Sequence, residues 1–208
     1  MFDSLDPIVV TGMGIVSALG VGKATTWAAL CQEQSAVGKI RYLQTEHTEL
    51  PVGEVPLSNN QMRDMLQIPE DKIVTRNPLV GMLAAKEAAD EAQLTDAHMT
   101  MAFINGTTVG GMDTSEQYYI DFLGNNSKSD FIAMHDCGIG TEQIADYLGH
   151  CDLVTTTSTA CSSALNSLIL AADLLERGRV DVAVAGGSEC LSKFHLNGFN
   201  SLMILDHN

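Results

Sequence analysis

The chain has 208 residues, a hydrophobic fraction of 45% and a net charge of −15. These values are typical of a folded protein with one large domain or two small ones. No run of about 18 apolar residues occurs, which excludes a membrane-spanning helix, and the acidic N-terminus lacks the basic start of a signal peptide. We therefore expect a cytoplasmic protein. Its negative field would repel phosphate backbones and anionic lipids, so neither a nucleic acid nor a membrane is expected as a partner.

The cysteines argue against both a disulfide framework and a zinc site. Their number is odd, and no pair has the C-x-x-C spacing of a metal ligand set. Free cysteines are most often buried and have no further function. We expect neither a metal nor a cofactor. The five residues are Cys31, Cys137, Cys151, Cys161 and Cys190.

The first half of the chain predicts one strand and three helices. Residues 7–11 read PIVVT, a β-branched run that predicts a buried strand, and a glycine turn follows it. That turn, Gly12-Met13-Gly14, matches half of a dinucleotide fingerprint, but Ser17 replaces the third glycine, and we reject a nucleotide site. Helices are predicted over 21–34 and 58–66, and over 77–92 with Pro78 in the first turn.

The second half alternates strands with helices. Apolar runs predict strands over 101–105, 152–157 and 180–185, and helical spacing appears in the segments between them, over 115–123, 141–148 and 161–177. A glycine-rich turn occupies 106–112. Strands that are apolar throughout and alternate with helices predict an α/β fold, with a parallel-type sheet covered on both faces.

The helix around residues 164–175 is apolar on every side. It reads ALNSLILAADLL, and a helix that is apolar all round is buried all round. A single covering helix would show one polar face. A second sheet, another chain or missing sequence must therefore cover the far side of this helix.

Cys161 stands where a predicted strand passes through small residues into this helix, in the run TTTSTACSS. The helix dipole and unpaired backbone N–H groups favour a thiolate at such a place, and those N–H groups can stabilise an oxyanion. Strand-to-helix turns are also common in structural roles. Position alone does not decide whether Cys161 is a nucleophile or a structural cysteine.

The segment TACSSALNSLILAADLLERGRVDVAVAGGSE resembles the active-site region of the β-ketoacyl-acyl-carrier-protein synthases, the condensing enzymes of fatty-acid and polyketide synthesis. IVVTGMGIVSALG, TRNPLVGMLAAKEAADEA, NGTTVGGMDTSE and GFNSLMILDHN are similar to the same family, in order and at suitable spacing. The likeness spans the whole chain and matches the N-terminal half of a family member. A thiolase is a weaker alternative, because the segments around Cys161 and residues 105–113 look more like the synthases.

The resemblance implies a thiolase-like layered fold for a single domain over 1–208, the N-terminal half of such an enzyme without its C-terminal half. That half would have a mixed, mostly parallel five-stranded sheet covered by helices. The helix that carries the nucleophile would lie in the central layer, between two sheets. This arrangement would account for the apolar helix.

The resemblance also implies a reaction. Cys161 would take an acyl chain from a carrier thioester, with its own backbone N–H as one oxyanion donor. In the complete enzyme, two histidines of the C-terminal half would assist decarboxylation of a malonyl thioester, and the carbanion would attack the acyl-cysteine. His195 and His207 match no family motif and are not expected to replace them. Alone, the chain would lack the groups for condensation. The residues expected to bind substrate are Thr107, Gly110, Gly111, Met112 and Ser162.

The implied partners are an acyl carrier protein, acyl and malonyl thioesters, and a second copy in a homodimer. The family docks its acidic carrier on basic residues near the pocket mouth, and Arg63, Lys72 and Arg76 are expected to form the only basic grouping in this acidic chain. A solvated face with scattered charge is the alternative reading of these three residues. A second function also stays open, in which a half-protein binds acyl chains or pairs with a separate C-terminal-half subunit.

Overall fold

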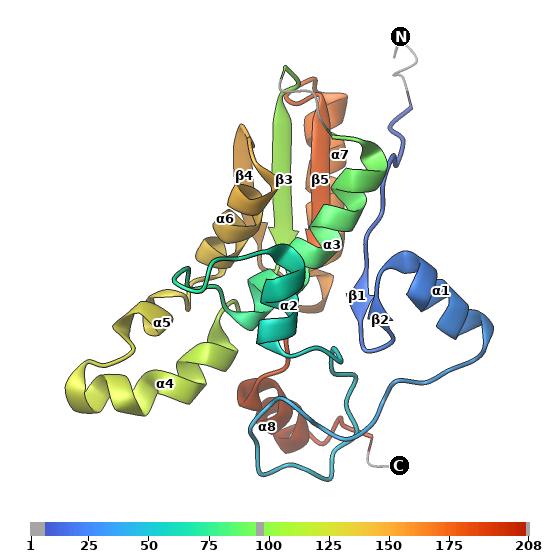
Figure 1. The fold of residues 1–208 in the computed structure, drawn as a ribbon. Coiled ribbons are helices and arrows are strands. Elements are labelled where there is room, and N and C mark those ends of the chain that lie inside the picture. The colour runs from blue at the N-terminus through green and yellow to red at the C-terminus, as the bar shows by residue number, and fades with distance from the viewer. Residues whose placement is uncertain (1–6, 95–97, 207–208) are drawn as a thin grey trace.

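The computed structural model describes residues 7–94 and 98–206. A parallel sheet stands at its centre (Figure 1), with the strand order β4-β3-β5. The strands are β3 (Met101–Gly106), β4 (Leu153–Thr157) and β5 (Val182–Gly187). In the register of the sheet, Ile104 pairs with Thr155 on one side and Ala185 on the other. Because the strands are parallel, all three carboxyl ends lie at one edge.

Helices cover both faces of this sheet. Helices α3 (Arg76–Ala92) and α6 (Cys137–Leu148) pack on one face, with α2 (Asn59–Leu66) against α3. On that side Phe103 joins Met82 and Ile144 in the main core. Helix α7 (Ser163–Glu176) packs on the opposite face, where Ile104 meets Ala171. Alternate residues of β3 thus supply the two cores, as the period of a strand requires. The predicted α/β class is confirmed.

The outer face of α7 is open. Leu165, Leu168 and Ile169 are 59%, 52% and 58% exposed, although each is an aliphatic side chain that helices normally bury. This is the face that the sequence assigns to another layer. That a second sheet, another chain or missing sequence covers this face stays a prediction.

The predicted strand over 7–11 is wrong, and so is the count of five strands in one sheet. Among the described residues the sheet has three strands, and the only other ladder is a short antiparallel hairpin of β1 (Val16–Ser17) and β2 (Gly20–Val21). Residues 7–11 run extended, and Val9 and Val10 are 67% and 78% exposed. Hydrophobic character alone does not make a strand when no neighbour bonds to its backbone.

Helix α3 fixes the path of residues 7–15, which we call the N-terminal segment. Met13 and Ile15 donate their N–H groups to the carboxylates of Glu91 and Glu87, at 2.8 and 3.0 Å. A Cβ on Gly12 would lie 2.1 Å from the carbonyl oxygen of Ala88, so only glycine permits this approach. The backbone is therefore held along α3 and away from the free edge of β5.

A cavity of about 870 Å³ lies between this segment and the rest of the fold. Its mostly apolar lining comes from the segment itself, from helix α1 (Lys23–Cys31) with Trp27, from α3, and from β3 and β5 of the sheet. Trp27 is 68% exposed. The N-terminal region therefore leaves apolar surface uncovered.

The remaining helices surround the carboxyl edge of the sheet. Helix α4 (Met112–Asn125) is longer at both ends than the predicted 115–123. Helices α5 (Ser129–Ala133) and α8 (Lys193–Ser201) were not predicted. The Ser192 hydroxyl caps α8 by accepting the N–H of His195, and the rings of Tyr118 and Phe131 pack α5 on α4 with centroids 4.9 Å apart. In residues 7–94 and 98–206, no helix has the length and apolar character needed to cross a bilayer.

Candidate active site

Cys161 lies in a turn that joins β4 to α7. The strand ends at Thr157, a single 3-10 turn, η1, spans Ala160–Ser162, and α7 begins at Ser163. Cys161 itself is exposed. The structure thus confirms the predicted junction of strand, nucleophile candidate and helix, and places the thiol at the N-terminal end of a 14-residue helix.

The turn is held by the hydroxyl of Ser163, which is 4% exposed. This hydroxyl donates to the carbonyl of Ala160 at 2.7 Å and accepts the N–H of Thr159 at 2.9 Å. Ala160 has a φ of +52°, a left-handed conformation that is uncommon for residues other than glycine. Non-glycine residues in this region persist only where their surroundings hold them, and they cluster at functional sites.

Two glycines let the first turn of α7 touch the ends of the strands. A Cβ on Gly106, the last residue of β3, would lie 2.5 Å from the backbone nitrogen of Ala164. A Cβ on Gly187, the last residue of β5, would lie 2.7 Å from the Cβ of Ala164. Both distances are shorter than atoms allow, so the nucleophile turn is packed directly on two strand ends. Neither glycine is among the residues that the sequence predicts for the site.

The turn after β3 packs against the segment that precedes α6. Gly110 has a φ of +54°, and a Cβ on Gly111 would lie 2.1 Å from the carbonyl oxygen of Met134. Gly111 also donates its N–H to the carbonyl of His135 at 3.2 Å. These two glycines are therefore required by close backbone contact. Met112 follows as the first residue of α4 and is half-buried.

Thr107 and Thr108 connect this turn to the nucleophile turn. The N–H of Thr107 donates to the carbonyl of Thr157 at 3.1 Å, and the hydroxyl of Thr108 donates to the carbonyl of Ala160 at 3.3 Å. The predicted substrate residue Ser162 lies in the same turn, where its hydroxyl donates to the carbonyl of Thr159 at 2.8 Å. The structure thus brings Thr107, Gly110, Gly111, Met112 and Ser162 to the carboxyl edge that carries Cys161.

The sequence matches the model of one protein family, described as Beta-ketoacyl synthase, N-terminal domain, over residues 5–208. The chain belongs to the beta-ketoacyl synthase family. It is 28% identical over 209 residues to 3-oxoacyl-[acyl-carrier-protein] synthase 2 of Staphylococcus aureus strain COL, covering 97% of this chain and 50% of that protein. Nodulation protein E of Rhizobium meliloti is 28% identical over 191 residues, covering 88% of this chain and 46% of that protein. The chain spans about half the length of these curated relatives.

Solved structures confirm the thiolase-like fold of a ketosynthase half. The ishigamide ketosynthase/chain length factor superposes with a TM-score of 0.81 at 24% identity, over 93% of this chain and 50% of that one. A chain of the complex of the ketosynthase ApeO with its chain length factor ApeC, from Xenorhabdus doucetiae, gives a TM-score of 0.76 at 25% identity. Coverage in that case is 96% of this chain and 51% of the other.

The other cysteines of this ketosynthase domain differ from Cys161. Burial raises the pKa of the Cys137, Cys151 and Cys190 thiols, and nearby carboxylates raise each further. Cys190 is the most enclosed of them and lies beside Asp113, whose own carboxyl pKa is raised by burial. Raised pKa values keep these thiols protonated, and a protonated thiol is a poor nucleophile. Cys31 is exposed but ends α1, where the dipole disfavours a thiolate.

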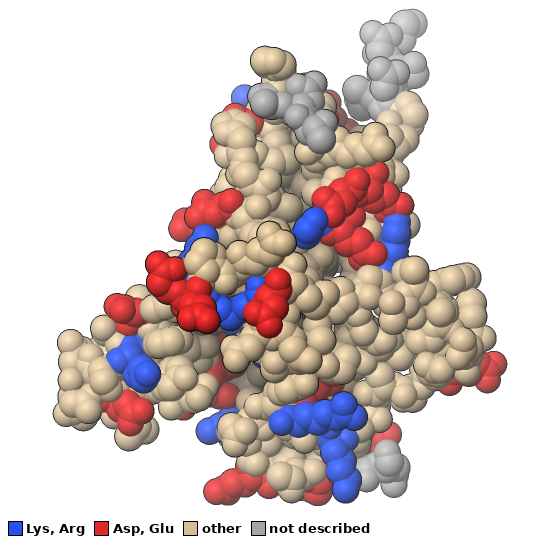
Figure 2. Space-filling view, in the orientation of Figure 1, with Lys and Arg blue, Asp and Glu red and all other residues tan. Residues whose placement is uncertain are grey.

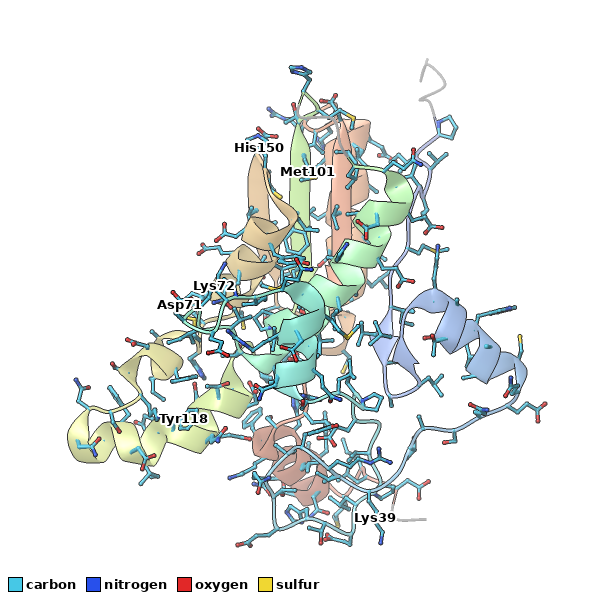
Figure 3. All side chains as sticks on the ribbon, in the orientation of Figure 1. Lys39, Asp71, Lys72, Met101, Tyr118 and His150 are labelled. Atoms are coloured by element: carbon cyan, nitrogen blue, oxygen red, sulfur yellow. The ribbon has the colours of Figure 1, made fainter. Side chains whose placement is uncertain are left out.

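Of the three predicted docking residues, Arg63 belongs to α2, Lys72 to the loop between α2 and α3, and Arg76 is the first residue of α3. The Arg63 guanidinium donates to the carbonyls of Pro69 and Lys72. The Arg76 guanidinium donates to the carbonyls of Val55 and Leu57. Lys72 is exposed next to Asp71 in the loop between α2 and α3 (Figure 3). Two of the three predicted docking residues therefore also stabilise the local fold.

Charge on this face is mixed, with acidic groups predominating. Figure 2 shows acidic side chains in several separate groups, one of them over α3, where Lys86 pairs with Asp90 and Lys23 with Glu91. Basic side chains lie between these groups, and a further basic patch lies at the lower edge of the view, where Figure 3 labels Lys39. The three predicted docking residues are therefore not the one basic grouping on this face, although acidic groups predominate, in keeping with the net charge.

His195 lies on α8 and has a local role. Its Nδ1 is 3.1 Å from the hydroxyl of Ser192, and its ring stacks on Phe199 with centroids 6.2 Å apart. His207 lies outside the described residues.

A group of polar residues next to the site was not predicted from the sequence. Asn77 is 3% exposed, donates to the hydroxyl of Thr107 at 2.9 Å, and accepts the hydroxyl of Ser188 at 2.6 Å. Glu189 accepts the N–H of Thr108 at 2.7 Å. The available signal was the polar pair Ser188-Glu189 directly after an apolar strand, because residues that follow the carboxyl ends of parallel strands lie at the functional edge.

Proposed function

We propose that the protein containing this chain is a 3-oxoacyl-[acyl-carrier-protein] synthase that carries its acyl group on Cys161. The observation that supports this most directly is the placement of an exposed cysteine after a left-handed residue at the N-terminal end of α7. The family to which the chain belongs gives the reaction class. Fatty-acid and polyketide synthesis are both compatible with it.

The first half-reaction is an acyl transfer. The thiolate of Cys161 attacks the carbonyl carbon of an acyl thioester on the carrier protein and forms a new carbon–sulfur bond. The tetrahedral oxyanion is stabilised by backbone N–H groups of the turn, that of Cys161 among them. The bond to the carrier's sulfur then breaks, and the carrier leaves as a thiol after taking a proton.

The second half-reaction needs groups that residues 1–208 do not supply. A malonyl thioester loses carbon dioxide, the resulting carbanion attacks the acyl-cysteine, and the Cys161 thiolate leaves. The assisting histidines belong to the C-terminal half of the enzyme in this proposal. Residues 107–112 and Ser162 would border the acyl chain, and the half-buried Met112 would limit its length.

The carrier protein would dock near Lys72. This lysine is exposed, and Arg63 and Arg76 keep their positive charge while bonded to carbonyls. Lys72→Glu should weaken binding of the acyl carrier protein, while Lys39→Glu, a charge reversal in another exposed loop, should leave it unchanged. Equal affinity of parent, Lys72→Glu and Arg76→Glu proteins would end the docking proposal.

A second candidate function is favoured by the open face of α7. Leu165, Leu168 and Ile169 are more than half exposed, and an apolar patch of this kind marks an interaction surface. A half-protein that binds acyl chains, or that pairs with a separate C-terminal-half subunit, would use it. A cytoplasmic homodimer is our proposal for the complete enzyme, and a stable monomer with low binding of apolar dyes would contradict both assemblies.

The deciding experiment measures acyl loading by intact mass. The protein is incubated with an acyl-carrier thioester, and the parent should gain one acyl group that Cys161→Ala does not gain. Cys31→Ala, the matched control at the other exposed cysteine, should load as the parent does. If Cys161→Ala accepts acyl groups as well as the parent, the proposed function is wrong.

A further inference from the structure

Glu189 connects the end of β5 to the loop that follows β3. It lies two residues beyond the last residue of β5. One carboxylate oxygen accepts the N–H of Thr108 at 2.7 Å. The other accepts the hydroxyl of Thr107 and the side-chain amide of Asn77, each at 3.3 Å. A single carboxylate therefore fixes both threonines of the loop, and its acceptor-only chemistry matches three donors.

Thr108 carries this link on to the nucleophile turn. Its hydroxyl donates to the carbonyl of Ala160 at 3.3 Å, the residue directly before Cys161. The second donor to that carbonyl, Ser163, belongs to the turn itself. Thr108 thus supplies the contact from outside the turn.

This contact acts on a strained residue. Ala160 has a φ of +52°, a conformation that persists only when the surrounding structure over-determines it. Its carbonyl and the N–H of Cys161 share one planar peptide group, so a force on the carbonyl sets the orientation of the cysteine backbone.

We propose that Glu189 is a positioning residue for acyl transfer, which acts through Thr108 on the peptide group between Ala160 and Cys161. The proposal rests on the proposed function of Cys161 as the acyl acceptor. Glu189 does not touch the acyl group in this role. It holds the turn in the geometry in which the thiolate and the oxyanion donors face the same carbonyl, and small misplacements of such groups lower reaction rates strongly.

The first test is Glu189→Gln, in the full-length protein or complex that contains this chain. The amide has the shape of the carboxylate, but its nitrogen must face either the N–H of Thr108 or the side-chain amide of Asn77, and both of these groups are donors. Single-turnover acylation of Cys161 is followed by intact mass. The rate constant should fall about tenfold, while the acylated fraction at the end point and the KM for the thioester stay unchanged. Glu142→Gln, at an exposed glutamate on α6, should react at the parent rate.

The second test is a double-mutant cycle. Thr108→Val keeps the N–H that Glu189 accepts and removes the hydroxyl that reaches Ala160. It should slow acylation to a similar degree, and Glu189→Gln should have little further effect in the Thr108→Val background.

The outcomes are distinguishable. A Glu189→Gln protein that acylates at the parent rate overturns the positioning role. The positioning role is also overturned if the variant has an unchanged rate constant but a lower end-point acylation and a lower melting temperature. That result would mean that part of the protein is unfolded. Fully additive effects in the cycle overturn the route through Thr108. Failure of the proposed function would instead appear without any change at Glu189, as a Cys161→Ala protein that loads acyl groups as well as the parent does.

Discussion

The carboxyl edge of the sheet and the N-terminal segment are held in different ways. At the edge, Gly106 and Gly187 admit backbone-to-backbone contact with α7, and buried side chains such as Asn77 bond across three elements. The N-terminal segment is fixed by two glutamates of α3, Glu87 and Glu91, and leaves Val9, Val10 and Trp27 exposed. The comparison indicates that residues of this chain fix the turn that carries Cys161, whereas the N-terminal region leaves apolar surface uncovered.

The largest effect should follow a change in the close contact beneath Cys161. Gly106→Ala places a Cβ 2.5 Å from the backbone of Ser163 and Ala164, which cannot move without displacing α7. We expect the free energy of unfolding to fall by about 3 kcal/mol, measured by urea denaturation. Gly124→Ala is the control, because a Cβ at this position in α4 would meet no atom within 4 Å. It should stabilise the protein by up to about 1 kcal/mol. Equal effects would contradict the close-contact account.

The next effect should come from the buried amide at the same edge. Asn77→Ala leaves the hydroxyls of Thr107 and Ser188 without this partner. The loss should be about 2–3 kcal/mol, since buried polar groups that lose partners are costly. Asn60→Ala, at an exposed asparagine on α2, should change the free energy of unfolding by less than about 0.5 kcal/mol. A similar loss of unfolding free energy in both variants would contradict the view that the buried hydrogen bonds of Asn77 stabilise this edge.

A comparable clash in the N-terminal segment should have a smaller, local effect. Gly12→Ala places a Cβ 2.1 Å from the carbonyl oxygen of Ala88, but the segment can move away from α3. We expect less than about 1 kcal/mol of global destabilisation and faster hydrogen exchange at Met13 and Ile15. Gly38→Ala, where a Cβ meets no atom within 4 Å, is the control. Destabilisation as large as that of Gly106→Ala would show that the two regions are equally constrained.

The smallest effect should be a dependence of this local attachment on pH. The ion pair with Lys23 and the N–H of Met13 hold the pKa of Glu91 below its ordinary value of 4.5. A lowered pKa in the folded state means that this group stabilises the attachment above pH 4.5 and ceases to do so as the pH falls through the lowered value. Exchange protection at Met13 should therefore decline in acid, and Glu91→Gln should remove the decline. Unchanged protection of the parent across this range would contradict the role of Glu91.

The sequence by itself determined the α/β alternation, the strands of the central sheet and the turn that carries Cys161. These features depend on local patterns: apolar runs over 101–105, 152–157 and 180–185, and small residues before the helix of Cys161. The resemblance to the ketosynthases identified the family from the same segments. The apolar character of 164–175 also predicted correctly that α7 presents more apolar surface than one sheet face covers.

Tertiary structure alone decided the remaining features. The run PIVVT has strand composition, yet it pairs with nothing, because the following Gly12 and Met13 are fixed to α3 by contacts 76 and 78 residues away in sequence. No local pattern marks Glu189, because its donor Thr108 reaches it only where the loops that follow β3 and β5 pack together. Local composition specifies how a segment can fold, but the partner of a backbone N–H or a carboxylate is set by the packing of distant elements.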